Sequence, residues 1–148
     1  VINDADAAGY ATINYGIGKG KMGLVVMITI GTGLGSGAFL DGELIPNFEL
    51  GQIPYKKYKK IELWAAASAK EREELSYKEW GKRFNTFLAL VELLISPDLI
   101  ILGGGTSKKF NEFKQYITID TPVVPAELRN EAGIIGAAAA ALHQAPRD

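Results

Sequence analysis

The chain has 148 residues, of which 47% are hydrophobic, so it can bury the core of one globular domain. Its formal net charge of -1 provides no overall basic field that would indicate nucleic acid as a partner. Because the sequence contains no cysteine, disulfides, thiolate nucleophiles and cysteine-ligated zinc are excluded, which suits a cytoplasmic protein. No apolar stretch is long enough to span a bilayer, so we expect no membrane partner.

The first part of the chain is predicted to form a helix followed by three antiparallel strands. Alanine-rich residues 4–15 favour a helix, which the glycines of residues 16–20 end. Residues 24–30 are a continuous apolar run rich in β-branched side chains, typical of a strand buried on both faces. The pair Asp41-Gly42 lies between two further apolar segments and predicts a tight hairpin, because both residues tolerate positive φ.

The middle of the chain is predicted to leave the core and then return as one long helix. Residues 52–69 have a poor pattern, weakly helical from Ile61 onward, and are interpreted as an excursion from the core. Ser76 and Glu79 have the spacing of a reciprocal helix cap, and Ser96-Pro97 ends the helix. Its predicted buried face consists of Trp80, Phe84, Phe87, Leu88, Val91 and Leu94.

The last part of the chain alternates between strands and helices. We expect a buried strand over residues 99–102, a helix over 107–116, a short strand over 121–124, and a final helix that Asn130 caps. Together these elements predict an α/β fold with a five-stranded mixed sheet flanked by helices.

Four short segments carry the candidate chemistry. Asn3-Asp4 provides a carboxylate, and a carboxylate can accept the proton of an attacking hydroxyl. The glycine-rich segments 31–37 and 103–105 can bring backbone N–H groups close to phosphate oxygens, since no side chain intervenes. Glu49 precedes Gly51 in a third turn, which could aim its carboxylate inward. The combination favours phosphoryl transfer.

Each of these segments also has a purely structural interpretation. Asp4 can cap the helix that follows it, Glu49 can be a solvated charge, and either glycine segment can be a turn without a ligand. Thr32 and Ser36 could donate hydrogen bonds to phosphate, Thr32 being the better candidate.

Two groups of lysines leave similar alternatives open. Lys108 and Lys109 could supply positive charge to a phosphate chain or could only solvate a helix. The tyrosine- and lysine-rich residues 55–60 fit a polyanion ligand, but an exposed, solubilising loop is the favoured interpretation. His143 is the single histidine and cannot form a metal site alone.

The motifs taken together resemble one family. They are residues 3–8, 31–33, 46–51, 70–73, 96–98, 103–109 and 121–126. In this combination the sequence is similar to the C-terminal part of the repressor, open-reading-frame and sugar-kinase (ROK) family, most of all its polyphosphate glucokinase branch. The resemblance implies an actin-like ATPase fold of the ribonuclease-H-like type, in which two domains close over a sugar.

The same resemblance implies roles for individual residues. Asp4 would be the catalytic base toward the sugar 6-hydroxyl, with Asn3 and Glu49 holding other sugar hydroxyls. Gln52 stands where the family usually has histidine, and it can still hydrogen-bond a hydroxyl. The phosphate and donor side would be formed by Gly31, Thr32, Gly33, Gly103, Gly104, Gly105 and Lys108.

The family's first phosphate loop has no counterpart in this sequence. We therefore expect residues 1–148 to be the C-terminal, larger domain of a two-domain kinase that is incomplete alone. The resemblance implies glucose as acceptor, polyphosphate or ATP as donor, and a homodimer, to which the apolar helix 80–94 could contribute. It also implies Mg²⁺ held mainly by the N-terminal part, and no zinc. The alternatives are a sugar-sensing regulator of the same family and a degenerate sugar-binding or assembly module.

Overall fold

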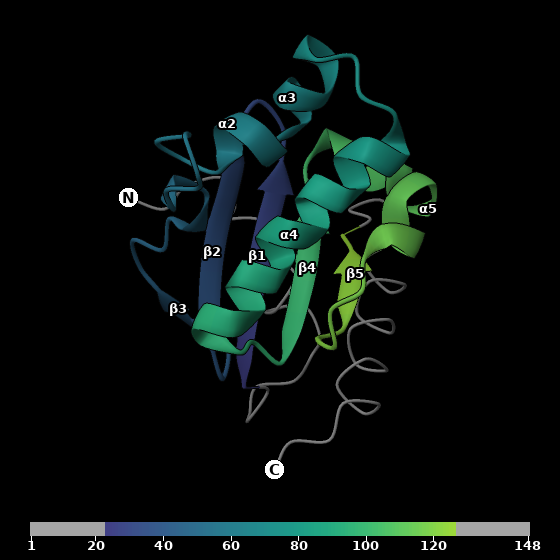
Figure 1. Cartoon of the computed structure of the whole chain (residues 1–148). Coiled ribbons are helices and arrows are strands. Elements are labelled where there is room, and N and C mark those ends of the chain that lie inside the picture. The colour runs from purple at the N-terminus through teal and green to yellow at the C-terminus, as the bar shows by residue number, and fades with distance from the viewer. Residues whose placement is uncertain (1–22, 127–148) are drawn as a thin grey trace.

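The computed structural model describes residues 23–126, which form a mixed sheet with helices packed against it (Figure 1). The strands are β1 (Leu24–Ile30), β2 (Leu34–Leu40), β3 (Glu43–Ile45), β4 (Leu99–Gly103) and β5 (Val123–Pro125). They lie in the order β3-β2-β1-β4-β5; β1 is antiparallel to β2 and parallel to β4. The predicted five-stranded mixed sheet is confirmed, while the predicted helices at 4–15 and after Asn130 lie outside the described residues.

The turn between β2 and β3 forms where Asp-Gly predicts it. Asp41 and Gly42 both have positive φ, 51° and 87°, as a two-residue turn with the twist of a hairpin requires. Asp41 also accepts a hydrogen bond through Oδ1 from Gly23 N–H, at 2.8 Å. The hairpin is therefore tied to the start of β1.

The long helix α4 (Tyr77–Ile95) begins and ends as predicted. Ser76 and Glu79 form the reciprocal cap, with both hydrogen bonds at 3.1 Å. Five of the six residues assigned to its buried face are fully buried, but Leu94 is 58% exposed, so that assignment is wrong. Ile95 instead packs against the core in the last turn, because it lies four residues after Val91 and therefore on the same face of the helix.

The interpretation of residues 52–69 as an excursion is largely wrong. Exposed residues are concentrated in the short hairpin of residues 54–60, which is closed at its base by the Ile61 N–H donating to the Ile53 carbonyl. Helices α2 (Glu62–Ala65) and α3 (Ala67–Arg72) follow, and three alanines of this segment, Ala65, Ala66 and Ala69, are fully buried. Alanine is too small to mark an amphipathic face in the sequence, yet its size lets these helices pack closely.

The single helix predicted over 107–116 is three short segments. They are η2 (Gly105–Lys109), α5 (Phe110–Phe113) and η3 (Lys114–Tyr116). The last strand, predicted over 121–124, begins two residues later and ends one residue later, at 123–125. Thr121 is held outside the ladder because its N–H and hydroxyl both donate to Glu92 Oε2, at 2.7 and 2.6 Å.

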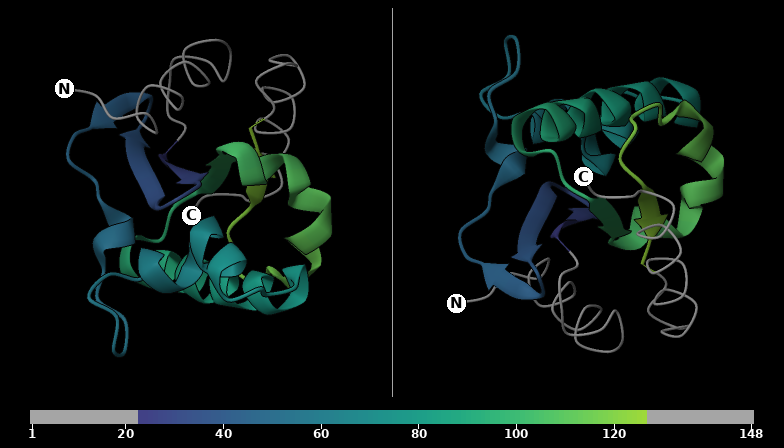
Figure 2. Two further views of the ribbon diagram at one scale, coloured as in Figure 1. Left: turned by 90° about the horizontal axis from the view of Figure 1, so that it is seen from above. Right: turned by 90° about the horizontal axis from the view of Figure 1, so that it is seen from below.

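The helices α2, α3 and α4 lie on one face of the sheet, as the views from above and below show (Figure 2). The core on this face joins the even-numbered residues of β1 and β4 to α4 and α5, including Val26, Ile28, Ile100, Leu102 and Phe84. Odd-numbered residues of the same strands, such as Val25 and Ile101, point to the other face and are equally buried. This pattern confirms that β1 is buried on both faces.

Candidate functional site

A pocket of about 510 Å³ lies where β1 and β4 end. It is lined by Thr29, Ile30, Gly31, Thr32, Gly33, Leu34, Gly35, Glu49, Glu62, Gly104 and Gly105. The carboxyl ends of parallel strands are a common place for ligand sites in open α/β sheets. The pocket brings together three of the segments that the sequence singles out.

Not every candidate residue lines this pocket. Gly103 is buried at the end of β4, and Lys108 is exposed on η2. Gln52 is exposed and reaches the pocket only through Glu62, whose Oε2 accepts from Gln52 Nε2 at 3.4 Å. Asn3 and Asp4 lie outside the described residues, so their predicted roles stay predictions.

The turn at residues 31–33 is arranged so that it can bind an anion. The Gly31 N–H donates to the Gly33 carbonyl at 3.0 Å, which folds the turn back on itself. Within residues 23–126, the next two N–H groups, of Thr32 and Gly33, have no hydrogen-bond acceptor. Consecutive N–H groups in a tight turn form a concave site for phosphate oxygens.

The glycines around the pocket differ in what they do. Gly104 has φ of 86°, and a Cβ there would lie 2.5 Å from the Ile30 carbonyl oxygen, so the fold itself requires glycine. At Gly31 and Gly105 a Cβ would meet nothing within 4 Å, and neither has positive φ. Glycine at these two positions therefore leaves open space in the pocket rather than relieving a clash.

Glu49 is held at the pocket by a buried serine that precedes it by thirteen positions in the chain. The Ser36 hydroxyl donates to the Phe48 carbonyl and accepts from the Leu50 N–H, both at 2.8 Å. Ser36 thus fixes the backbone on either side of Glu49. The idea that Ser36 donates to phosphate is wrong, because its side chain is fully buried and already bonded.

Glu62 is a pocket residue that the sequence analysis did not identify. It begins α2, and its Oε1 accepts from the Leu34 N–H at 3.0 Å. Lys60 lies 3.7 Å from Oε2, in a partly exposed ion pair. A Cβ on Gly33 would be 2.6 Å from Glu62 Oε1, so the carboxylate packs directly on the glycine turn. Only the contact across the fold could reveal it, because Glu62 lies in the segment interpreted as an excursion.

Two carboxylates, of Glu49 and Glu62, are among the side chains that line the pocket. No group of three or more histidine, cysteine, aspartate or glutamate side chains between residues 23 and 126 could hold a metal. The Glu62 carboxylate is already bonded to an N–H and to Gln52.

No helix in this part of the chain is both long and apolar enough to cross a membrane.

The lysine-rich segment lies outside the pocket lining. Tyr55 and Tyr58 exchange backbone hydrogen bonds at 3.1 and 2.8 Å, which makes a tight hairpin with Lys56 and Lys57 at its tip. Tyr55 stacks on Trp64 with ring centroids 4.6 Å apart. The exposed hairpin fits the favoured solubilising role, and a polyanion ligand stays a hypothesis.

The apolar helix proposed for dimer contacts turns its large side chains inward. Trp80, Phe84, Phe87, Leu88 and Val91 are fully buried against the chain's own sheet, leaving Leu93 and Leu94 exposed. The homodimer therefore remains an expectation from the family resemblance.

Comparison with known proteins finds relatives of 46% and 48% identity. No family model matches the chain. Polyphosphate glucokinase of Mycobacterium tuberculosis (strain CDC 1551 / Oshkosh) is 46% identical over 142 residues, which cover 96% of this chain and 53% of that protein. The solved inorganic polyphosphate/ATP-glucomannokinase from Arthrobacter sp. strain KM has a TM-score of 0.81 at 48% identity, covering 97% of this chain and 56% of that one. The chain thus spans about half the length of these relatives.

A more distant structure agrees in fold. A ROK family glucokinase from Streptomyces griseus, solved in complex with glucose and AMPPNP, has a TM-score of 0.68 at 23% identity. The match covers 93% of this chain and 66% of that one. At this identity the likeness concerns the fold alone. These neighbours confirm the actin-like fold predicted from the sequence.

Proposed function

We propose that this chain, which is similar to polyphosphate glucokinases and has the fold of the ROK-family sugar kinases, is the C-terminal, larger domain of a glucokinase. The complete enzyme would transfer a phosphoryl group from polyphosphate or ATP to the 6-hydroxyl of glucose. The chain spans only about half of its relatives, so the activity is proposed for the complete protein.

One observation carries the proposal: the pocket combines two kinds of lining. Glu49 and Glu62 supply carboxylates, which accept hydrogen bonds from sugar hydroxyls. The Gly31-Thr32-Gly33 turn supplies N–H groups without acceptors among residues 23–126, and N–H groups donate to phosphate oxygens. A sugar and a phosphate donor could therefore meet in one pocket, each against the chemistry that suits it.

The proposed reaction needs a base, and it needs hydrogen-bond donors that stabilise negative charge on the transferred phosphoryl group. Asp4 would accept the proton of the 6-hydroxyl as its oxygen attacks the terminal phosphorus and the bond to the donor breaks. Donated hydrogen bonds from the glycine turn, and open space at Gly105, would receive the transferred phosphoryl group. Asn3 and Gln52 would add sugar contacts, and Lys108 would attract the donor.

The complete protein would also have a bound metal, a cellular location and an oligomeric state. We place the main Mg²⁺ ligands in the rest of the complete protein, as the family resemblance implies. A cytoplasmic location and a homodimer follow from the family resemblance.

The test is the glucose phosphorylation rate of the complete protein with Mg²⁺ and either polyphosphate or ATP as the only donor. We expect activity with polyphosphate, and near-complete loss in Asp4→Ala at an unchanged melting temperature. Full turnover in Asp4→Ala would show that Asp4 is not the catalytic base. Binding of glucose without turnover with either donor would favour the sugar-sensing regulator, and failure to bind glucose would favour an assembly module.

A further inference from the structure

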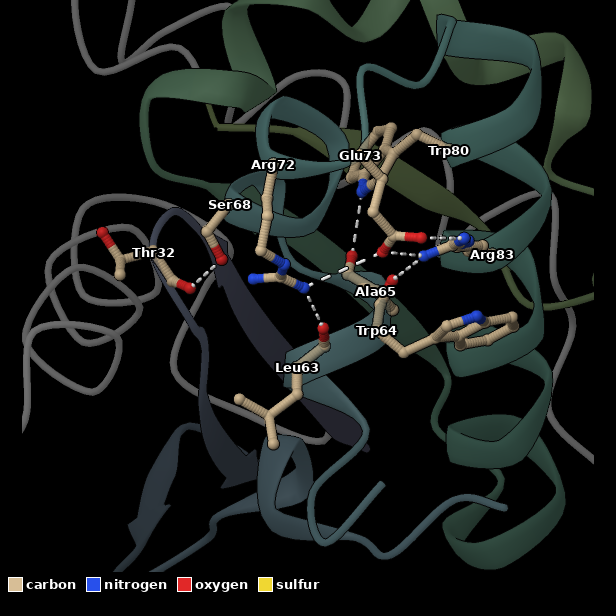
Figure 3. A network of polar contacts seen from close by, with 9 residues as sticks. All are labelled: Thr32, Leu63, Trp64, Ala65, Ser68, Arg72, Glu73, Trp80 and Arg83. Carbon is tan, nitrogen blue, oxygen red and sulfur yellow. Dashed lines mark hydrogen bonds and ion pairs between the residues drawn. The ribbon is translucent and has the colours of Figure 1, made fainter. Parts of the chain in front are cut away.

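Ser68 makes a hydrogen bond that links helix α3 to the glycine turn of the pocket. Its hydroxyl donates to the Thr32 carbonyl at 2.6 Å, across 36 positions of the chain (Figure 3). No sequence motif points to Ser68, and it does not line the pocket itself. We propose that Ser68 is a positioning residue, which orients the Gly33 N–H for phosphate in the kinase function proposed above.

The geometry of the peptide group explains how a contact to a carbonyl controls an N–H. The Thr32 carbonyl and the Gly33 N–H belong to one peptide group, which is planar and trans. In a trans peptide the C=O and N–H point in opposite directions. When Ser68 fixes the carbonyl on its own side, the Gly33 N–H must point away from α3.

The turn is held at one end by helix α3 and at the other end by helix α2. On one side Ser68 of α3 binds the Thr32 carbonyl, and on the other Glu62 of α2 accepts from the Leu34 N–H. Between these two contacts lies the Gly33 N–H, which has no acceptor among residues 23–126. A glycine has no side chain to restrict its backbone, so without external contacts the peptide could rotate.

The helices that carry these two residues are themselves fixed to α4. Three successive carbonyls at the end of α2 receive side-chain hydrogen bonds: Leu63 from Arg72, Trp64 from Arg83 and Ala65 from Trp80, at 2.7, 3.0 and 2.9 Å (Figure 3). Trp80 is fully buried in the core. Ser68 therefore lies on a pair of helices, α2 and α3, that is hydrogen-bonded to the long helix α4.

An ion pair also joins these two helices to α4. Both terminal nitrogens of Arg83 bind the Glu73 carboxylate, at 2.8 and 2.9 Å. Two parallel hydrogen bonds of this kind fix orientation as well as distance. Because Arg83 also holds the Trp64 carbonyl, one side chain joins the ends of α2 and α3 to α4.

The experiment compares Ser68→Ala with Ser68→Thr in the complete protein. We expect kcat/KM for the phosphoryl donor to fall roughly tenfold in Ser68→Ala, since one hydrogen bond that orients the donor site is lost. The dissociation constant for glucose should stay within about twofold, because Glu49 and Glu62 are untouched. Ser68→Thr keeps a hydroxyl and should recover most of the donor kcat/KM.

Ser76→Ala is the matched control. It removes a serine hydroxyl that also makes one backbone hydrogen bond, but at the start of α4 rather than at the turn. We expect it to lower the melting temperature without changing the donor kcat/KM. Equal donor kinetics in Ser68→Ala and the wild type, or the same kinetic loss in Ser76→Ala, would overturn the positioning role.

Binding of tripolyphosphate by calorimetry separates this proposal from the proposed function. If the wild-type protein does not phosphorylate glucose but Ser68→Ala binds tripolyphosphate several-fold more weakly, the kinase function fails while Ser68 still positions an anion site. If the wild type is active and both proteins bind tripolyphosphate equally, the kinase function stands and the role of Ser68 is refuted. Absence of tripolyphosphate binding to the wild type would overturn the role of Ser68, while the kinase function would stand or fall on glucose phosphorylation with polyphosphate or ATP.

Discussion

Two neighbouring glycines at the pocket should respond in opposite ways to the same added methyl group. Gly104 has φ of 86° and ψ of 174°, a region that only glycine occupies without strain. A Cβ there would also lie 2.5 and 2.9 Å from backbone atoms of Ile30, which cannot move without distorting β1. At Gly105 the same methyl meets nothing within 4 Å.

The expected sizes follow from these contacts. Backbone strain of about 1–3 kcal/mol and overpacking of about 1–3 kcal/mol together make Gly104→Ala less stable by about 2–6 kcal/mol. A domain of this size loses roughly 2–4 °C of melting temperature per kcal/mol, so even the lower bound gives a fall of about 4–8 °C. Gly105→Ala should be as stable as the wild type, or slightly more so.

Thermal unfolding and donor kinetics of the complete protein test this pair. Gly105→Ala should keep its melting temperature but lose at least about tenfold in kcat/KM for the donor, because its methyl occupies space meant for phosphate. An unchanged melting temperature in Gly104→Ala would show that the backbone at Gly104 does not lie as close to Ile30 as described. Normal donor kinetics in Gly105→Ala would exclude this side of the pocket from phosphate binding.

Three further substitutions test other contacts of the site and its support. Glu62→Gln keeps an acceptor oxygen for the Leu34 N–H but loses its charge, so the melting temperature should hold while calorimetry shows glucose affinity reduced about tenfold. Ser36→Ala removes the partner of the buried Leu50 N–H and of the partly buried Phe48 carbonyl; we expect a loss of about 1–3 kcal/mol in unfolding free energy, and a normal melting temperature would contradict the clamp on Glu49. The Arg83 hydrogen bond lowers the pKa of Glu73 below its ordinary 4.5, so this pair stabilises the fold above that pH and its contribution is lost as the pH falls further. In acid titrations of the melting temperature, Glu73→Gln should remove part of the decline below about pH 4.5, and an unchanged titration would show that the pair adds no stability.

The elements that the sequence predicted well are those with local causes. The β-branched run of β1 extends over the predicted residues, and Asp41-Gly42 turns the hairpin because the two residues tolerate positive φ. Ser76 and Glu79 cap α4 at the predicted spacing of three. Each of these signals depends on residues within a few positions of one another, so a sequence read without its fold contains them in full.

The candidate site was predictable only in part. The glycine segments at 31–33 and 104–105 and the carboxylate of Glu49 do line one pocket. Gly103 does not, because the strand is still in the sheet at that residue and its neighbour makes the turn. The error at Leu94 has a similar origin: a helical pattern gives the spacing of an apolar face but not where the core beneath it ends.

The sequence alone therefore determined the strands, the hairpin, the long helix and the glycine turns that follow β1 and β4. The tertiary structure decided which side chains serve those turns. Ser36, Glu62 and Ser68 make their contacts across 14, 28 and 36 positions of the chain. Two of them lie in a segment whose small alanines give no periodic signal, and only packing against α4 brings that segment to the end of the sheet. Side-chain hydrogen bonds between distant residues depend on this packing, so no local pattern could have predicted them.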